Sequence, residues 1–153
     1  MKYGNSPKRV AEYFLYLSAR DHRTLTPMQV LKLVYIAHGW HLGLYGRPLV
    51  NETVEAWQYG PVIRSLYREY KRFGSRPIDD IVSCKPEGFD AEEEDTIEQV
   101  WRAYGTRTGV SLSALTHQPD SPWSQTVERS GINSDISDDL IEDHYRRLAQ
   151  AAK

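Results

Sequence analysis

Three histidines are the side chains whose type and spacing best suit chemistry at neutral pH. His38 and His41 stand three residues apart, so a helix would place both on one side, and His117 could join them from another part of the chain. Catalytic zinc takes three protein ligands and a water, which makes a metal-dependent hydrolase one hypothesis. We favour the alternative, in which each imidazole packs in or near the core and bonds to a carbonyl or carboxylate. The sequence therefore predicts no metal and no other cofactor.

The sequence offers no nucleophile in a recognisable setting. Cys84 lacks the flanking residues that mark cysteine nucleophiles. Residues 109–113 come nearest to a Gly-x-Ser-x-Gly elbow, but a serine replaces the second glycine, and Ser111 is better placed to cap a helix. No glycine precedes a lysine and no Gly-x-Gly pair occurs, which excludes the common phosphate-binding loops. We expect a protein without enzymatic activity.

Charge is distributed unevenly along the chain. Residues 60–76 carry five bases and one acid, and Arg64, Arg68 and Arg72 recur every four residues with Tyr67 alongside. Residues 87–98 carry seven acids and no base. The basic stripe suits an acidic protein partner or a nucleic acid, and a third interpretation is ordinary solvation with charges placed to suit the helix dipoles. Because a specific DNA binder contacts roughly six to ten phosphates, we favour the protein partner.

Length and composition are those of one ordinary domain. The chain has 153 residues and a formal net charge of −2, and we expect a single domain over residues 1–153. One cysteine excludes an intramolecular disulfide and is typical of a reducing compartment, so we expect a cytoplasmic protein. The densest apolar stretch, residues 31–44, contains a lysine and two histidines, and we therefore expect no membrane span.

Local patterns predict a mainly α-helical domain of about six helices around a buried central helix, with a small β-hairpin between the second and third helices. The helices are expected at about 7–19, 27–44, 60–74 and 90–105, from 111 to before 119, and from 137 onward. The hairpin is expected within 48–59, with a turn at residues 51 and 52, and a long loop at 75–88.

The helix at 27–44 is the expected centre of the fold. Thr26 and Gln29 match a capping box at its start, and apolar residues fall on all its sides, which is typical of a helix covered by neighbours. Gly39 and Gly43 lie four residues apart on it, where each costs ~1 kcal/mol relative to alanine. We therefore expect another helix to approach closely at these glycines.

Three stretches of the chain carry longer motifs. They are Leu25-Thr26-Pro27-Met28-Gln29-Val30-Leu31-Lys32-Leu33-Val34-Tyr35-Ile36-Ala37-His38-Gly39, then Gly46-Arg47-Pro48-Leu49 with Val54-Glu55-Ala56-Trp57-Gln58-Tyr59-Gly60-Pro61-Val62, and finally Leu112-Ser113-Ala114-Leu115-Thr116-His117 with Pro122-Trp123. Together they resemble the Panacea domain, the SocA-like antitoxin family once labelled as a phage-associated protein. The resemblance runs from about residue 24 to residue 123.

The resemblance implies a helical domain that neutralises a cognate toxin encoded beside it by direct binding, in some members as an adaptor for a protease such as ClpXP. It implies no catalysis. The motif residues would then preserve the scaffold: Leu33, Tyr35, Trp57, Tyr59, Gly60, Pro61, Val62, His117, Pro122 and Trp123. Toxin contacts would lie on a variable surface, for which Arg64, Arg68, Arg72 and Tyr67 or the loop at 75–88 are our candidates. Nucleic acid is not an expected partner.

Overall fold

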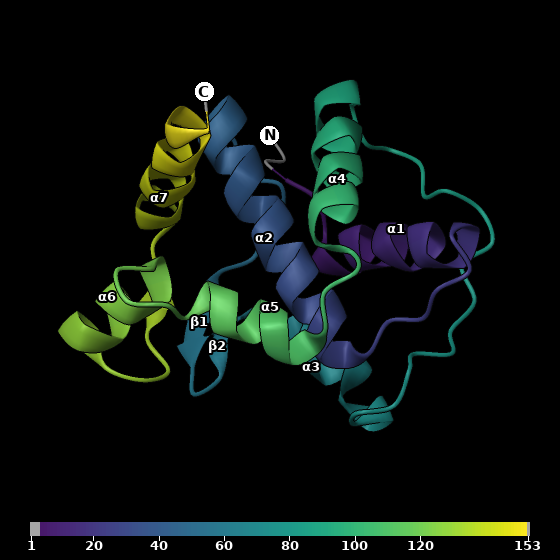
Figure 1. Cartoon of the computed structure of the whole chain (residues 1–153), viewed down its shortest axis with the longest axis horizontal. Coiled ribbons are helices and arrows are strands. Elements are labelled where there is room, and N and C mark those ends of the chain that lie inside the picture. Colours follow the sequence, from purple (N-terminus) through teal and green to yellow (C-terminus); the bar gives the residue numbers. More distant parts are fainter. Residues whose placement is uncertain (1–3, 153) are drawn as a thin grey trace.

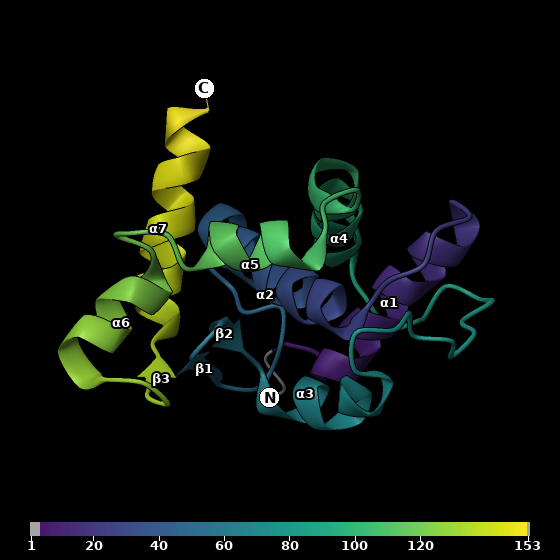
Figure 2. The same ribbon diagram turned by 60° about the horizontal axis from the view of Figure 1, so that its bottom comes forward.

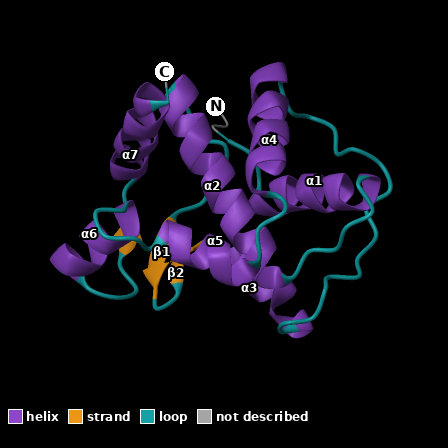
Figure 3. Ribbon diagram, viewed as in Figure 1, coloured by secondary structure: helices purple, strands orange, loops and turns teal. Residues whose placement is uncertain are grey.

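The computed structural model describes residues 4–152 and confirms a mainly helical fold with a small antiparallel sheet (Figure 1, Figure 3). The described residues form seven α-helices, one 3-10 turn and three strands. In chain order these are α1 (Pro7–Arg20), α2 (Pro27–Tyr45), β1 (Val54–Trp57), β2 (Gly60–Val62), α3 (Arg64–Tyr70), η1 (Lys71–Phe73), α4 (Ala91–Tyr104), α5 (Gly109–Thr116), α6 (Pro122–Ser130), β3 (Asp135–Ile136) and α7 (Asp138–Ala151).

Helix α2 is the centre of the fold, as its composition predicts. Its capping box is present: the N–H of Gln29 donates to the Thr26 hydroxyl, and the N–H of Thr26 donates to Oε1 of Gln29 at 2.8 Å. Gly46 ends the helix with a left-handed φ of +69°. Helices α1, α4, α5 and α7 pack against α2, which crosses the middle of the molecule (Figure 1, Figure 2). Most side chains of α2 are therefore buried.

Helix α7 makes the close approach that the two glycines of α2 predict. A Cβ added at Gly39 would lie 2.2 Å from Cε2 of Tyr145, and one added at Gly43 would lie 2.8 Å from the backbone nitrogen of Arg146. The Tyr145 ring also meets the Trp40 ring edge-on, with centroids 5.3 Å apart. The backbone of α7 thus lies where any side chain at residue 43 would have to be.

The β-hairpin forms, but its turn lies later in the chain than predicted. Strands β1 and β2 pair antiparallel with Trp57 opposite Gly60, so the turn is at residues 58 and 59 and not at residues 51 and 52. Gly60 and Pro61 begin a strand and not a helix. The φ of Gly60 is +118°, which the hairpin turn requires, and β2 is an edge strand of the order β2-β1-β3, where proline is tolerated.

Two further predictions are wrong in the segment between α4 and α7. Ser111 does not cap α5, because Thr108 does so by accepting the N–H of Ser111 at 3.0 Å. The predicted helices leave residues 119–136 without one, yet Ser121 caps α6 and Pro122 occupies its first position. The short strand β3 pairs with β1 and was also not predicted. Thr108 and Ser121 are both of residue types that commonly cap helices, so the sequence contained a local signal for each helix start.

The buried apolar side chains form one cluster to which α1, α2, α3, α4, α5, α7 and the sheet all contribute. Residues 75–88 contain neither helix nor strand, as expected, although Ile78 is buried and its N–H donates to the carbonyl of Leu25 at 2.8 Å. Within residues 4–152, no helix has the length and hydropathy that crossing a lipid bilayer requires.

The contact between α2 and α7 makes Gly43→Ala a test of the fold. Alanine favours a helix by about 1 kcal/mol, but its Cβ would overlap backbone atoms of α7, and overpacking of this kind costs ~1–3 kcal/mol. We expect a lower free energy of unfolding, measured by urea denaturation, with an unchanged slope. A variant as stable as the parent, or more stable, would contradict the close approach of α7.

Candidate functional site

Three backbone carbonyls of the hairpin each accept a hydrogen bond from the side chain of a different helix. The carbonyl of Trp57 accepts from Nε1 of Trp123 in α6 at 2.6 Å. The carbonyl of Tyr59 accepts from the hydroxyl of Ser113 in α5 at 2.7 Å, and that of Pro61 accepts from Nζ of Lys32 in α2 at 3.0 Å. All three donors lie in the sequence motifs, so these bonds join the motifs in space. We call them the carbonyl anchors.

Lys32 is the least expected of the three donors. Its side chain is only 1% exposed, and the Pro61 carbonyl is its hydrogen-bond acceptor among the described residues. Burial lowers the pKa of Lys32 from 10.5 to about 7. Gly60 leaves the space that the amine occupies, because a Cβ there would lie 2.8 Å from Nζ. The sequence signal was a lysine in an otherwise apolar helix face, and we had not selected Lys32 as a site residue.

The outer side of α3 lies next to this hairpin and carries the predicted basic stripe. Arg64, Tyr67, Arg68 and Lys71 follow the spacing i, i+3, i+4, i+7, which places them on one helix face, and all four are exposed. Tyr67 meets the Trp57 ring of the hairpin at 4.9 Å between centroids. We call these four residues the α3 face.

The arginines differ in how far their charge is neutralised. Arg64 donates to Glu55 at 2.9 Å, and hydrogen bonds from Trp57 and Arg64 lower the pKa of that carboxyl. Arg68 forms no ion pair with any described residue. The α3 face therefore retains positive charge at its centre.

Arg72, the remaining arginine of the predicted stripe, is paired within the chain. It belongs to the 3-10 turn η1, where it donates to Asp80 at 3.0 Å and to the carbonyl of Glu69 at 2.7 Å. Lys71 belongs to the same turn, and its Nζ lies 6.0 Å from the centre of the Tyr67 ring, which joins it to the α3 face.

The basic and acidic segments do not neutralise each other. In the described part of the chain, the ion pairs of residues 87–98 run to Arg20, Arg47 and Lys85. None of these cations belongs to the α3 face. The exposed Cys84 lies in the loop before the acidic segment.

His38 is buried and has both ring nitrogens in hydrogen bonds. Its Nδ1 accepts from the N–H groups of Leu49 and Val50 at 3.2 and 3.3 Å. Because Nδ1 is an acceptor, Nε2 must carry the hydrogen, which it donates to Asp138 at 2.9 Å. This imidazole therefore connects α2 to the start of α7, and it bonds to a carboxylate as the sequence analysis favours.

The other two candidate histidines, His41 and His117, contact different partners. Nδ1 of His41 is 2.9 Å from the hydroxyl of Thr96 in α4, and burial lowers the pKa of His41 to about 4, so its ring is neutral. The His117 ring lies against the Trp123 ring, with centroids 5.3 Å apart. Among residues 4–152, no three potential ligands gather to hold a metal ion. The histidines do not form the site that the metal hypothesis requires.

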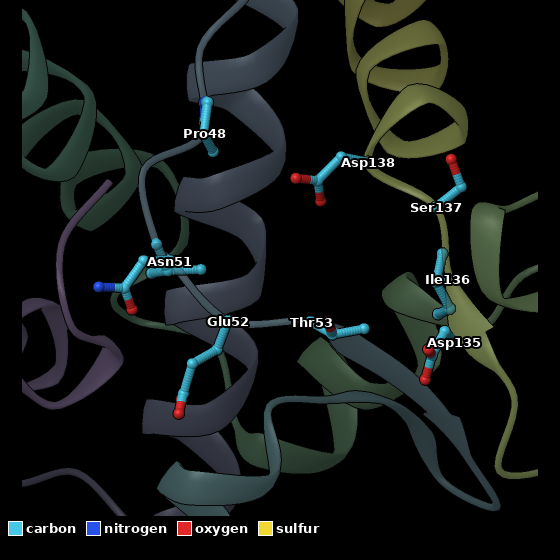
Figure 4. A pocket seen from close by; sticks show the side chains of 9 residues that line it. Pro48, Asn51, Glu52, Thr53, Asp135, Ile136, Ser137 and Asp138 are labelled. Carbon is cyan, nitrogen blue, oxygen red and sulfur yellow. The ribbon is translucent and has the colours of Figure 1, made fainter. Parts of the chain in front are cut away.

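Asp138 borders a hollow of about 420 Å³ between residues 48–53 and the start of α7. Glu52 and Asp135 also line this hollow. In Figure 4 the side chain of Asp138 points toward α2, and the side chains of Glu52 and Asp135 point away from Asp138. Glu52 accepts a hydrogen bond from the hydroxyl of Ser65. In this view the three carboxylates do not converge on a common point.

Comparison with known proteins agrees with the motifs. A family model described as the Antitoxin SocA-like, Panacea domain matches residues 30–124. The chain belongs to this family. Antitoxin SocA of Caulobacter vibrioides (strain NA1000 / CB15N) is 32% identical over 155 residues, which cover 91% of this chain and 81% of that protein. No solved structure matches the chain.

The Panacea match encloses the elements described above. It begins inside α2 before Lys32 and ends in α6 just after Trp123, so it contains the hairpin, all three carbonyl anchors and the α3 face. Helix α1 and helix α7 lie outside it. The family's shared region thus corresponds to the hairpin and the helices that hold it.

The buried amine of Lys32 predicts a particular pH dependence of stability. The unfolded chain binds the Lys32 proton up to about pH 10.5 and the folded chain only up to about 7, so stability should rise with pH between these values, by up to ~1.4 kcal/mol per pH unit. Below about pH 7 the full cost of burying the charge is present. We expect Lys32→Met to reduce this rise, as measured by urea denaturation at pH 7, 8 and 9.

The exposed Lys85 provides the matched control. Lys85→Met should keep the parental pH dependence, because its side chain is 45% exposed in its pair with Glu94. A Lys32→Met variant with the same pH dependence as the parent would show that the amine is not held uncharged.

Proposed function

We propose that this protein is an antitoxin of a toxin–antitoxin system, which neutralises a cognate toxin encoded nearby by direct protein–protein binding. Membership of the Antitoxin SocA-like family is the observation that carries the proposal. We further propose that residues 1–153 act as a single cytoplasmic domain with a regulatory and non-catalytic role. The hydrogen bonds that occupy both ring nitrogens of His38 are compatible with that role.

We propose the α3 face as the surface that contacts the toxin. Specific interfaces are enriched in aromatic residues and arginine, which this face combines in Tyr67, Arg64 and Arg68. The carbonyl anchors fix the neighbouring hairpin, so the Trp57 ring is held in contact with the Tyr67 ring. Positive charge on the face selects a toxin surface with exposed carboxylates and speeds its association.

Two routes from binding to neutralisation are open to such a protein. In the first, the antitoxin covers the toxin's active surface. In the second, it delivers the toxin to a ClpXP-type protease, which requires that the toxin and the protease contact different parts of the antitoxin. We propose delivery as the finer mechanism and blocking as its alternative.

Alanine substitution of Arg64, Arg68 and Arg72 together should weaken the complex with the toxin at least tenfold, because most of the charge and the central arginine of the surface are lost. The dissociation constant is measured by titration calorimetry with the purified toxin. Arg68→Ala should account for most of the loss, since Arg64 and Arg72 are already paired within the chain.

The matched control removes three exposed arginines elsewhere, Arg102, Arg129 and Arg147. It should bind the toxin like the parent, and both variants should have the parental circular dichroism spectrum. Equal affinity for the two triple variants would remove the α3 face from consideration. Recovery of nucleic acid in place of a protein partner, with binding that falls steeply with salt, would favour the nucleic-acid interpretation of the stripe.

Delivery and blocking differ in what happens to the toxin in cells. Under delivery, producing the antitoxin should shorten the half-life of the toxin several-fold, and deleting the protease should restore it. The measurement is a translation shut-off chase followed by immunoblotting. An unchanged toxin half-life in cells that the antitoxin protects would contradict delivery and assign neutralisation to blocking.

A further inference from the structure

A small hollow of about 220 Å³ lies between the start of α2 and the α3 face. Its walls are mainly apolar and come from both helices and the turn after η1. The lining residues are Pro27, Met28, Leu31, Tyr67, Lys71 and Gly74. Two members of the α3 face, Tyr67 and Lys71, therefore form one wall of it.

The hollow has an apolar floor and a cationic rim. Leu31 is 7% exposed and forms part of the core, whereas Tyr67 is 41% exposed, which is high for a large aromatic side chain. Nζ of Lys71 lies 6.0 Å from the centre of the Tyr67 ring, and Arg68, which follows Tyr67 in the chain, lies outside the lining of the hollow. No carboxylate lines this hollow.

Its charge sets it apart from two other hollows of the described structure. The hollow at the start of α7 is lined by Glu52, Asp135 and Asp138. An apolar groove of about 320 Å³ between α2, α4 and α7 contains Asp95. Only the hollow beside α3 joins apolar walls to a cation, Lys71, without an acid among its lining residues, so it is the one of these three that complements an acidic partner.

The size of the hollow indicates what it can hold. Pockets for small organic ligands usually measure roughly 300–1,000 Å³, and this one is smaller. One large apolar side chain, inserted from another protein, suits its volume. Anchors of this kind, buried in a pocket and ringed by polar contacts, dominate the energy of many interfaces.

The hollow is built into the free protein. Pro27 and the capping box fix the first turn of α2, and Gly74 ends η1 with a φ of +61° and an N–H bond to the carbonyl of Lys71 at 3.0 Å. Gly109 of α5 packs against the Met28 side chain from the other side, where a Cβ would lie 2.9 Å away. A partner would therefore meet a preformed pocket, which reduces the entropy cost of binding.

We infer that this hollow receives one apolar side chain from an acidic segment of the toxin, with Tyr67 as its wall and Lys71 and Arg68 pairing with the carboxylates on either side. The inference rests on the proposed function and identifies the chemistry of the toxin segment. It also assigns specificity to Lys71 and Met28, which lie beyond the arginine stripe.

The test compares three variants in binding to the purified toxin. Met28→Trp fills the hollow, Tyr67→Ala removes its wall, and Lys71→Glu reverses the charge of its rim. Each should weaken the complex at least tenfold. The loss for Lys71→Glu should be greater at low salt, because its effect is electrostatic, whereas the loss for Tyr67→Ala should change little with salt.

Two matched controls test whether position matters. Leu148→Ala removes a side chain of α7 that is 41% exposed, like that of Tyr67, and lies outside the hollow, and Arg129→Glu reverses an exposed charge on α6. Both should bind the toxin like the parent. Tyr67 and Lys71 are exposed, so these two variants should fold even if Met28→Trp proves unstable in thermal unfolding.

The outcomes separate the inference from the proposed function. If the parent binds the toxin and the Tyr67→Ala and Lys71→Glu variants bind it equally well, the inference is overturned and the antitoxin role stands. A parent chain that binds no toxin and gives no protection would overturn both. Weaker binding by the three variants but not by the controls is the result that we expect.

Discussion

The hairpin β1–β2 depends on hydrogen bonds that its own strands cannot supply. Two strands of four and three residues are too short to be stable by themselves in water. Trp123, Ser113 and Lys32 donate from three different helices to the carbonyls of residues 57, 59 and 61. The sheet is thus held in place by the helical domain, and the position of Trp57 beneath Tyr67 follows from it.

Helix α2 makes this arrangement possible because it is covered on almost all sides. One side accepts α7 against Gly39 and Gly43, while Lys32, near its start, reaches Pro61. His38 connects the same helix to the first residue of α7. A single rigid element therefore sets the relative positions of the hairpin, the C-terminal helix and the hollow beside α3.

The sequence predicts those parts of the structure that are decided within a few residues. Local patterns located the starts of α1, α2, α4 and α7, and the glycine pair indicated a close helix contact without naming α7. Local patterns failed where a distant contact decides, as at Gly60, whose strand conformation is fixed by pairing with Trp57 and by the amine of Lys32. Spacing predicted that Arg64, Tyr67 and Arg68 lie on one exposed side of a helix, but it could not show that α3 ends at Tyr70 and that Lys71 and Arg72 both follow in a 3-10 turn. A role of these residues in partner binding stays a prediction.

The order in which the carbonyl anchors are synthesised has a consequence for the newborn chain. Lys32 precedes the hairpin in the chain, but Ser113 and Trp123 emerge from the ribosome long after it. Two of the three hydrogen-bond donors to the hairpin are therefore absent when its strands have been synthesised. Domains whose contacts are far apart in sequence pay the entropy of loop closure before those contacts form. We therefore expect the hairpin to be ordered only when synthesis is almost complete. A prematurely terminated chain would therefore lack an ordered hairpin beside the α3 face.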